Sequence, residues 1–165
     1  MILKGEIAST LKLLDIKYRA HSTPKEALLL SKLAVLELCG WIEESMDDLI
    51  RRCASRHLKD PANLLYLENQ VIKRTHAFEY ERFRAMLIQA IGLINVERIE
   101  AKFDKAILST LKAQLAVLKA SRDPEAHTHI KGTKTINAPS ITISQFDHVY
   151  AGLKHIEKLV RTTKI

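Results

Sequence analysis

Glycine, proline, aromatic residues and cysteine are all scarce in this 165-residue chain. Five glycines and four prolines are too few for the many turns of a β-sandwich or barrel, and the composition is far from that of collagen. Aromatic residues make up only 5% of the chain, whereas Leu, Ala, Lys and Glu are abundant, so the sequence predicts an all-α protein. The length predicts one domain, 1–165, with a core that needs neither a disulfide nor a metal.

The two cysteines, Cys39 and Cys53, fall within one predicted helix, which places them about 21 Å apart. A disulfide requires Cα atoms within about 7 Å of each other, so the two cannot pair. Free thiols suit a reducing compartment, and the N-terminus lacks the pattern of a signal peptide, so we expect a cytoplasmic protein. The longest nearly apolar run, 85–94, is about half the length of a membrane-spanning helix, so no membrane association is expected.

Apolar residues recur at helical spacing through most of the chain. Because no repeat, linker or low-complexity tract interrupts this pattern, the sequence predicts a single up-and-down helical bundle of about five helices. The predicted helices cover approximately residues 7–19, 24–58, 61–91 with a break near 75–76, 95–118 and 144–161.

Helix-start and helix-stop signals set these boundaries. Thr23-Pro24 and Asp60-Pro61 each combine an N-cap residue with a proline suited to the first helical position. Gly92 is a predicted C-cap, Asn95 is the predicted N-cap of the fourth helix, and Ser144 begins a sequence that resembles a capping box.

The net charge of +7 is concentrated in the second half of the chain. Residues 1–82 carry 13 basic and 12 acidic side chains, whereas residues 83–165 carry 13 basic and 7 acidic ones. A basic excess of this kind favours a polyanionic partner, and nucleic acid is favoured over a membrane because no basic amphipathic helix with an aromatic face is present.

A long connection in the basic half, about residues 121–143, is the predicted functional segment. Two to eight residues would join antiparallel helices, and longer connections are usually functional or disordered. Within it, Asp123 and Pro124 form an N-cap signal, so we expect a short helical turn to begin there. Arg122 and His127 would then face each other across the helix start, beside free N–H groups that form an anion site.

This combination suits phosphodiester chemistry on RNA. The 2′-OH of RNA is its own nucleophile, so neither a protein nucleophile nor a metal is obligatory. His127 is predicted to move the proton near neutral pH, Arg122 to stabilise charge on the phosphate, and Asp123 to orient the pair. Glu43 and Glu44 are two further residues that could orient a motif side chain.

Arg122-x-x-x-x-His127, with Asp123 after the arginine and Ala126 before the histidine, resembles the signature of HEPN domains. The resemblance extends over the helical pattern from about Pro24 to Arg161. It implies an all-α homodimer in which the two motifs meet at the interface. It further implies a metal-independent endoribonuclease of the toxin or abortive-infection type, with a cognate antitoxin or neighbouring-gene protein as a possible partner. Other family members are catalytically silent, and a non-catalytic adaptor that binds nucleotide, RNA or protein is the alternative.

A row of basic residues predicts where RNA would lie. Arg98 and three lysines recur every seven residues along the fourth helix, on the face opposite its apolar residues, and the row ends just before Arg122. An ordinary solvated face is the alternative reading. The candidate RNA-binding residues are Lys105, Lys112, Lys119, His129 and Lys131.

Two other readings are weaker. His127 and His129 are not supported by further residues at metal-ligand spacing, so no metal and no cofactor are predicted. Nonspecific DNA binding is the other weaker reading, because the sequence has no helix-turn-helix pattern. A second basic cluster, at residues 51–59, suits the C-terminal end of a helix without any ligand.

Overall fold

The computed structural model describes residues 1–20, 23–75, 78–126 and 135–163. These residues contain seven α-helices and one π-helical segment, and no strand, so the all-α prediction is confirmed. The helices are α1 (Gly5–Ala20), α2 (Pro24–Ala54), α3 (Pro61–Tyr66), the π-helix η1 (Leu67–Ile72), α4 (Tyr80–Ile91), α5 (Leu93–Glu100), α6 (Lys105–Ala126) and α7 (Pro139–Thr162).

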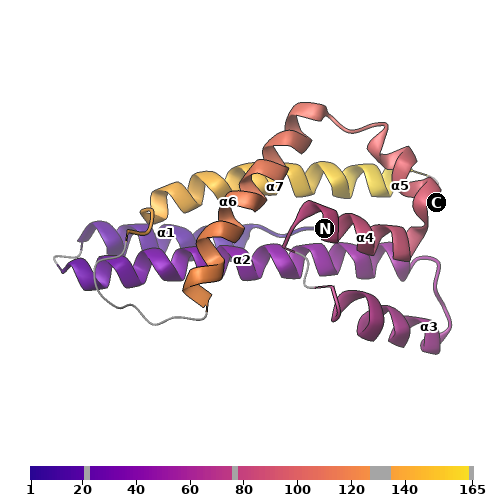
Figure 1. Cartoon of the computed structure of the whole chain (residues 1–165), viewed down its shortest axis with the longest axis horizontal. Coiled ribbons are helices and arrows are strands. Elements are labelled where there is room, and N and C mark those ends of the chain that lie inside the picture. Colours follow the sequence, from indigo (N-terminus) through magenta and orange to yellow (C-terminus); the bar gives the residue numbers. More distant parts are fainter. Residues whose placement is uncertain (21–22, 76–77, 127–134, 164–165) are drawn as a thin grey trace.

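Three long helices form the body of the molecule. Helices α1, α2 and α7 lie lengthwise beside one another, with α2 and α7 running in the same direction, while α6 crosses them steeply (Figure 1). The described helices are therefore not a simple up-and-down bundle of five, because α6 crosses its neighbours instead of running alongside them. Helix α4 lies along the C-terminal half of α2, and the main contact of α3 is with η1.

The buried apolar residues form one continuous cluster that draws on α1, α2, η1, α4, α5, α6 and α7. On α2, six residues at helical spacing are all buried: Val35, Cys39, Ile42, Met46, Leu49 and Cys53. Leu111, Leu115 and Leu118 are the fully buried face of α6. A Cβ atom at Gly152 of α7 would lie 2.9 Å from the Leu111 Cβ, so α6 and α7 approach closely at this crossing.

Several helix boundaries agree with the sequence signals. The Thr23 hydroxyl accepts the Glu26 N–H at the start of α2, and an Asp60 carboxylate oxygen accepts the Ala62 N–H at 2.8 Å at the start of α3. Gly92 ends α4 with a φ of 82°, a conformation that suits glycine. The predicted break near residues 75–76 falls between η1 and α4.

The predicted fourth helix, 95–118, is wrong because the chain breaks between α5 and α6. Asp104 accepts hydrogen bonds from the N–H groups of Ala106 and Ile107, at 2.8 and 3.1 Å, and so begins a new helix. Its own N–H donates to His155 Nε2 of α7 at 3.2 Å. Asn95 is not an N-cap, since α5 begins at Leu93.

The predicted capping box at Ser144 is also wrong. Helix α7 begins one and a half turns earlier, at Pro139, which occupies the first helical position. Pro139, Thr142 and Gln145 are buried there, so tertiary packing extends the helix toward its N-terminus. No helix in the described part of the chain combines the length and the apolar character that crossing a membrane requires.

Candidate functional site

Arg122 lies near the C-terminal end of α6, where its side chain meets two other segments. Its Nη2 is 3.0 Å from Glu43 Oε1 on α2, and its Cζ is 5.3 Å from the ring centroid of Phe78, which precedes α4. The side chains of Arg122 and Glu43 are 31% and 30% exposed, and Phe78 is buried. The guanidinium group is therefore held by a carboxylate and an aromatic ring while part of it faces solvent.

The sequence places these groups together through two apolar faces. On α6, Arg122 follows Leu118 by one turn, so it emerges at the edge of the buried face. On α2, Glu43 follows the buried Cys39 by one turn. Burial raises the pKa of the Cys39 thiol to about 12 although Arg122 opposes the shift, so a neutral thiol lies beneath the ion pair. Glu43, one of the two residues expected to be able to orient a motif side chain, thus forms an ion pair with Arg122.

The predicted helical turn beginning at Asp123 is wrong. Helix α6 continues through Asp123 and Pro124 to Ala126, so Asp123 is a helical residue and not an N-cap. The turns of α6 before Asp123 are packed in the core through the buried Leu111, Leu115 and Leu118. Because of this packing, the helix continues beyond the Asp123-Pro124 pair and does not restart there.

The same correction removes the predicted anion cradle. Without a helix start at Asp123, no set of free N–H groups faces the motif from this position. Asp123 is exposed, and its Oδ1 lies 4.0 Å from Arg122 Nη1. Among the described residues at this end of α6, stabilisation of an anion therefore depends on cationic side chains such as Arg122.

The predicted motif loop, 121–143, is shorter than expected. Residues 121–126 belong to α6 and residues 139–143 to α7, so the connection consists of residues 127–138. The predicted proton-transfer residue His127 and the candidate RNA-binding residues His129 and Lys131 lie outside the described residues.

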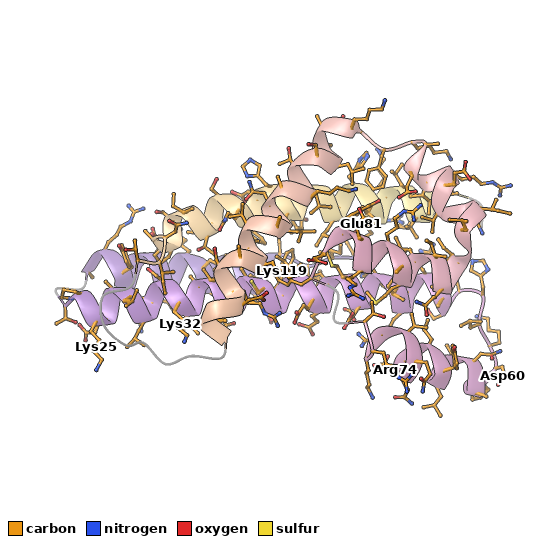
Figure 2. All side chains as sticks on the ribbon, viewed as in Figure 1. Lys25, Lys32, Asp60, Arg74, Glu81 and Lys119 are labelled. Carbon is orange, nitrogen blue, oxygen red and sulfur yellow. The ribbon has the colours of Figure 1, made fainter. Side chains whose placement is uncertain are left out.

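The predicted row of free lysines is partly neutralised. Lys112 Nζ is 2.9 Å from Glu81 Oε1 and 4.4 Å from the Tyr80 ring centroid, and Lys119 pairs with Glu79. These ion pairs join α6 to the first turn of α4, and Figure 2 shows Lys119 and Glu81 on the facing helices. Lys105 is exposed at the first position of α6. Arg98 lies on α5 and is not part of the α6 row.

A hollow of about 590 Å³ lies beneath these ion pairs and reaches Asp123. Its floor is apolar, from Leu115 and Ala116, and its rim carries the paired charges. The hydrogen bond from Lys119 lowers the pKa of Glu79, and burial raises the pKa of Tyr80, so the rim carboxylate is ionised and the phenol is neutral. The hollow can thus accept an apolar group beside Asp123.

Two residues near Arg122 were not predicted from the sequence. Phe78 was not distinguishable from an ordinary core residue. Asp47 lies one turn after Glu43 on α2. Burial raises the pKa of Asp47 to about 6; the nearby Arg51 lowers this pKa, whereas Glu68 raises it further. The sequence did contain a signal for Asp47, since two acidic residues one helical turn apart, here Glu43 and Asp47, repel each other.

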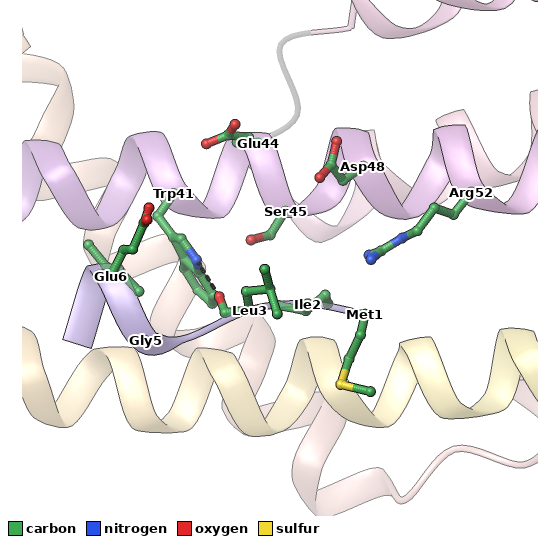
Figure 3. Close-up of a pocket in the computed structure, with 11 residues that line it drawn as sticks. Met1, Ile2, Leu3, Gly5, Glu6, Trp41, Glu44, Ser45, Asp48 and Arg52 are labelled. Carbon is green, nitrogen blue, oxygen red and sulfur yellow. Dashed lines mark hydrogen bonds between the residues drawn. The ribbon is translucent and has the colours of Figure 1, made fainter. Parts of the chain in front are cut away.

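Glu44, the other predicted orienting residue, does not face Arg122. It lines a separate hollow of about 400 Å³ with Trp41, Ser45 and Asp48, on the side of α2 next to the N-terminal segment (Figure 3). Trp41 Nε1 donates a hydrogen bond to the Leu3 carbonyl at 3.0 Å and fixes that segment.

Among the described residues, no three His, Cys, Asp or Glu side chains are arranged to hold a metal ion. Comparisons with protein-family models, curated proteins and solved structures found no match to this chain. The functional conclusion therefore rests on the residues and their geometry.

Proposed function

We propose that this protein is a metal-independent endoribonuclease that cleaves RNA through attack of the 2′-OH, with Arg122 and His127 as catalytic residues. The observation that carries the proposal is the ion pair between Arg122 and Glu43. It holds a guanidinium group at the protein surface, over the Phe78 ring, five residues before a histidine in the chain. The resemblance to HEPN domains supports the same assignment.

Arg122 retains donors for a phosphate while it is paired with Glu43. A guanidinium group has five N–H donors in a planar fork, and the ion pair with Glu43 places Nη2 at 3.0 Å from one carboxylate oxygen. The remaining N–H groups can donate to the non-bridging oxygens as negative charge develops on phosphorus. Glu43 acts as a positioning residue, and Asp123, 4.0 Å from Nη1, acts on the orientation of the same group.

Proton transfer is assigned to His127. In-line transesterification removes the proton of the 2′-OH and forms a bond from the 2′ oxygen to phosphorus. The bond to the 5′ oxygen breaks, and that oxygen receives a proton. An imidazole can take up and release a proton near pH 7. Lys105, Lys112, Lys119, His129 and Lys131 are assigned to RNA binding.

A first prediction concerns the products. Cleavage of a single-stranded RNA by the purified protein is expected to survive EDTA and to leave a 2′,3′-cyclic phosphate and a 5′-OH, which mass spectrometry identifies. A substrate with one 2′-deoxynucleotide at the scissile position should resist cleavage, because it lacks the nucleophile. Products with a 5′-phosphate, formed only when divalent cations are present, would contradict the proposal.

A second prediction concerns assembly. One His127 cannot easily serve both oxygens on opposite sides of phosphorus, whereas a two-fold dimer brings a second motif to the same site. Exposed apolar residues on α6 and α7, such as Val117 and Ile141, are available to an interface. Light scattering is expected to show a homodimer, and specific activity should fall on dilution. A fully active monomer would exclude a composite site.

A non-catalytic adaptor is the second candidate. The observation in its favour is the pairing of Lys112 with Glu81 and of Lys119 with Glu79, which leaves the α6 row less cationic than the sequence suggests. RNA or nucleotide binding without cleavage in the assay above would support the adaptor.

The proposed cellular setting follows from the buried free thiols of Cys39 and Cys53, which suit a reducing cytoplasm. An active ribonuclease in the cytoplasm would cleave the cell's own RNA, so its activity requires regulation. A cognate antitoxin or neighbouring-gene protein is the proposed partner.

A further inference from the structure

A second hollow, remote from Arg122, is lined by three arginines. It has a volume of about 350 Å³ and lies between the C-terminal ends of α2 and α7, with Arg52 on α2, Arg56 in the turn that follows α2, and Arg161 on α7. Arg52 follows Glu43 by nine residues, which places it about 14 Å along α2 and on the opposite face of the helix. The hollow is therefore separate from the proposed ribonuclease site.

The single carboxylate of this hollow, Glu157, is already satisfied by other donors. Its Oε1 accepts the Ile2 N–H at 2.8 Å, and its Oε2 accepts from Lys154 Nζ at 2.6 Å. Burial would raise the pKa of Glu157, but the bonds from Lys154 and Ile2 outweigh it and lower the pKa. Glu157 is thus ionised and offers little further bonding capacity.

Arg52 is left without a hydrogen bond at its buried end. Its Nη2 is 3.4 Å from Glu157 Oε1, yet this buried nitrogen has no hydrogen-bond partner among the described residues. A buried donor without a partner is costly, and a charged one more so. Arg52 lines both this hollow and the neighbouring one beside the N-terminal segment, and Figure 3, which draws the neighbouring hollow, shows its side chain leaving α2 toward Met1. The guanidinium group therefore has unused donors on the wall of a hollow.

The other two arginines are exposed at the rim. Within the described residues, neither Arg56 nor Arg161 takes part in a hydrogen bond or ion pair. The remaining polar group on the wall, the Cys53 thiol, is neutral because burial raises its pKa to about 11, although Arg56 and Arg52 oppose the shift. Three cations thus surround a hollow whose only negative charge is already compensated.

The ends of α2 and α7 explain how three cations are tolerated here. The C-terminal end of a helix carries a partial negative charge that stabilises nearby cations. This effect favours arginine at these positions, but it supplies no hydrogen-bond acceptor to Arg52 Nη2, whose contact with Glu157 is an ion pair at 3.4 Å without a hydrogen bond. A group with several anionic oxygens would supply such an acceptor.

We propose that this hollow binds a phosphomonoester group, with Arg56 and Arg161 contacting it from the rim and Arg52 from the wall. Three guanidinium forks match a dianionic group with three terminal oxygens better than a carboxylate or a phosphodiester. A volume of about 350 Å³ also suits a small ligand. The group has two sources, a free nucleoside monophosphate or the 5′-phosphate end of an RNA.

Isothermal titration calorimetry of the full-length protein with inorganic phosphate tests the site. One saturable site per chain is expected, and Arg56→Ala and Arg161→Ala should each weaken binding at least tenfold. Arg98→Ala on α5 is the matched control for lost charge and should change the affinity less than twofold. Arg122→Ala should also leave binding unchanged, because it removes the ribonuclease site alone.

The two sources are distinguished with 5′-AMP and with a trinucleotide RNA carrying either a 5′-phosphate or a 5′-OH. Tighter binding of AMP than of the 5′-phosphorylated RNA identifies a free nucleotide, and the reverse order identifies an RNA end. Absence of saturable phosphate binding up to about 10 mM, or wild-type affinity in both rim variants, would overturn the proposal. Loss of binding in Arg122→Ala would also overturn it. Arg56 and Arg161 are exposed, so circular dichroism should show unchanged folding.

Discussion

Replacing Arg122 by alanine is expected to lower the rate of RNA cleavage by about 10²-fold or more, the loss typical of removing one transition-state donor. Because the guanidinium group contributes to charge stabilisation on phosphorus, the loss should appear in kcat. His127→Ala should be at least as severe, since no other residue is assigned to proton transfer. Single-turnover cleavage of a labelled RNA measures both effects.

The control for this prediction is Arg98→Ala, which removes an exposed arginine of α5 and should retain activity within about twofold. Arg122→Ala also removes a partly exposed ion pair, which contributes about 1 kcal/mol or less, so its melting temperature should stay close to that of the wild type. A variant that cleaves RNA at the wild-type rate would remove its residue from the site.

Glu43→Gln separates positioning from charge. A glutamine keeps a hydrogen-bond acceptor for Arg122 Nη2 but removes the carboxylate that fixes it at 3.0 Å. A smaller loss than in Arg122→Ala is therefore expected, again in kcat and not in KM. Equal effects of Glu43→Gln and Arg122→Ala would mean that the charge of Glu43 is itself required.

Replacing Gly152 by alanine is expected to destabilise the fold by about 1–3 kcal/mol, the usual cost of adding a methyl group to a packed crossing. The new Cβ would lie 2.9 Å from the Leu111 Cβ and 3.0 Å from both of its Cδ atoms. Since a Cβ atom moves only with its backbone, α6 must shift away from α7. Thermal unfolding should show a midpoint lower by about 2–4 °C per kcal/mol.

Gly40→Ala is the matched control, because it makes the same chemical change inside another long helix. No atom lies within 4 Å of a Cβ built at Gly40, so the change should stabilise α2 by about 0.5–1 kcal/mol through its higher helix propensity. The two substitutions are thus expected to shift the melting temperature in opposite directions. A similar shift in both would show that the crossing at Gly152 is not tightly packed.

Two Asp-Pro pairs show what the sequence can and cannot predict here. Asp60-Pro61 begins α3 as its local pattern indicates, whereas Asp123-Pro124 lies inside α6. The local signal is the same in both places. The difference is that Asp60 follows a turn, while Asp123 follows a helix whose buried leucines already pack against α2 and α7.

Only part of the candidate site could be predicted from the sequence. Arg122 follows from the motif, and its partner Glu43 was one of two glutamates that could orient it, between which the sequence does not decide. Phe78 and the carboxylate partners of the α6 lysines do not, because they come from segments that only the tertiary fold brings near α6. The interruption before α6 has the same origin, since it depends on His155 of a distant helix.

Helix α3 has a different relation to the rest of the molecule. All six of its residues are exposed, and its main contact is with η1. The π-helix η1 has three buried apolar residues and is held to α2 by two hydrogen bonds between Arg51 and Glu68, at 2.9 and 3.0 Å. Local unfolding of α3 exposes little new apolar surface, so it costs far less than global unfolding. Its amide protons can therefore exchange rapidly while the bundle stays intact, and changes of chain length between residues 61 and 66 would leave the pairing of α2 with α6 undisturbed.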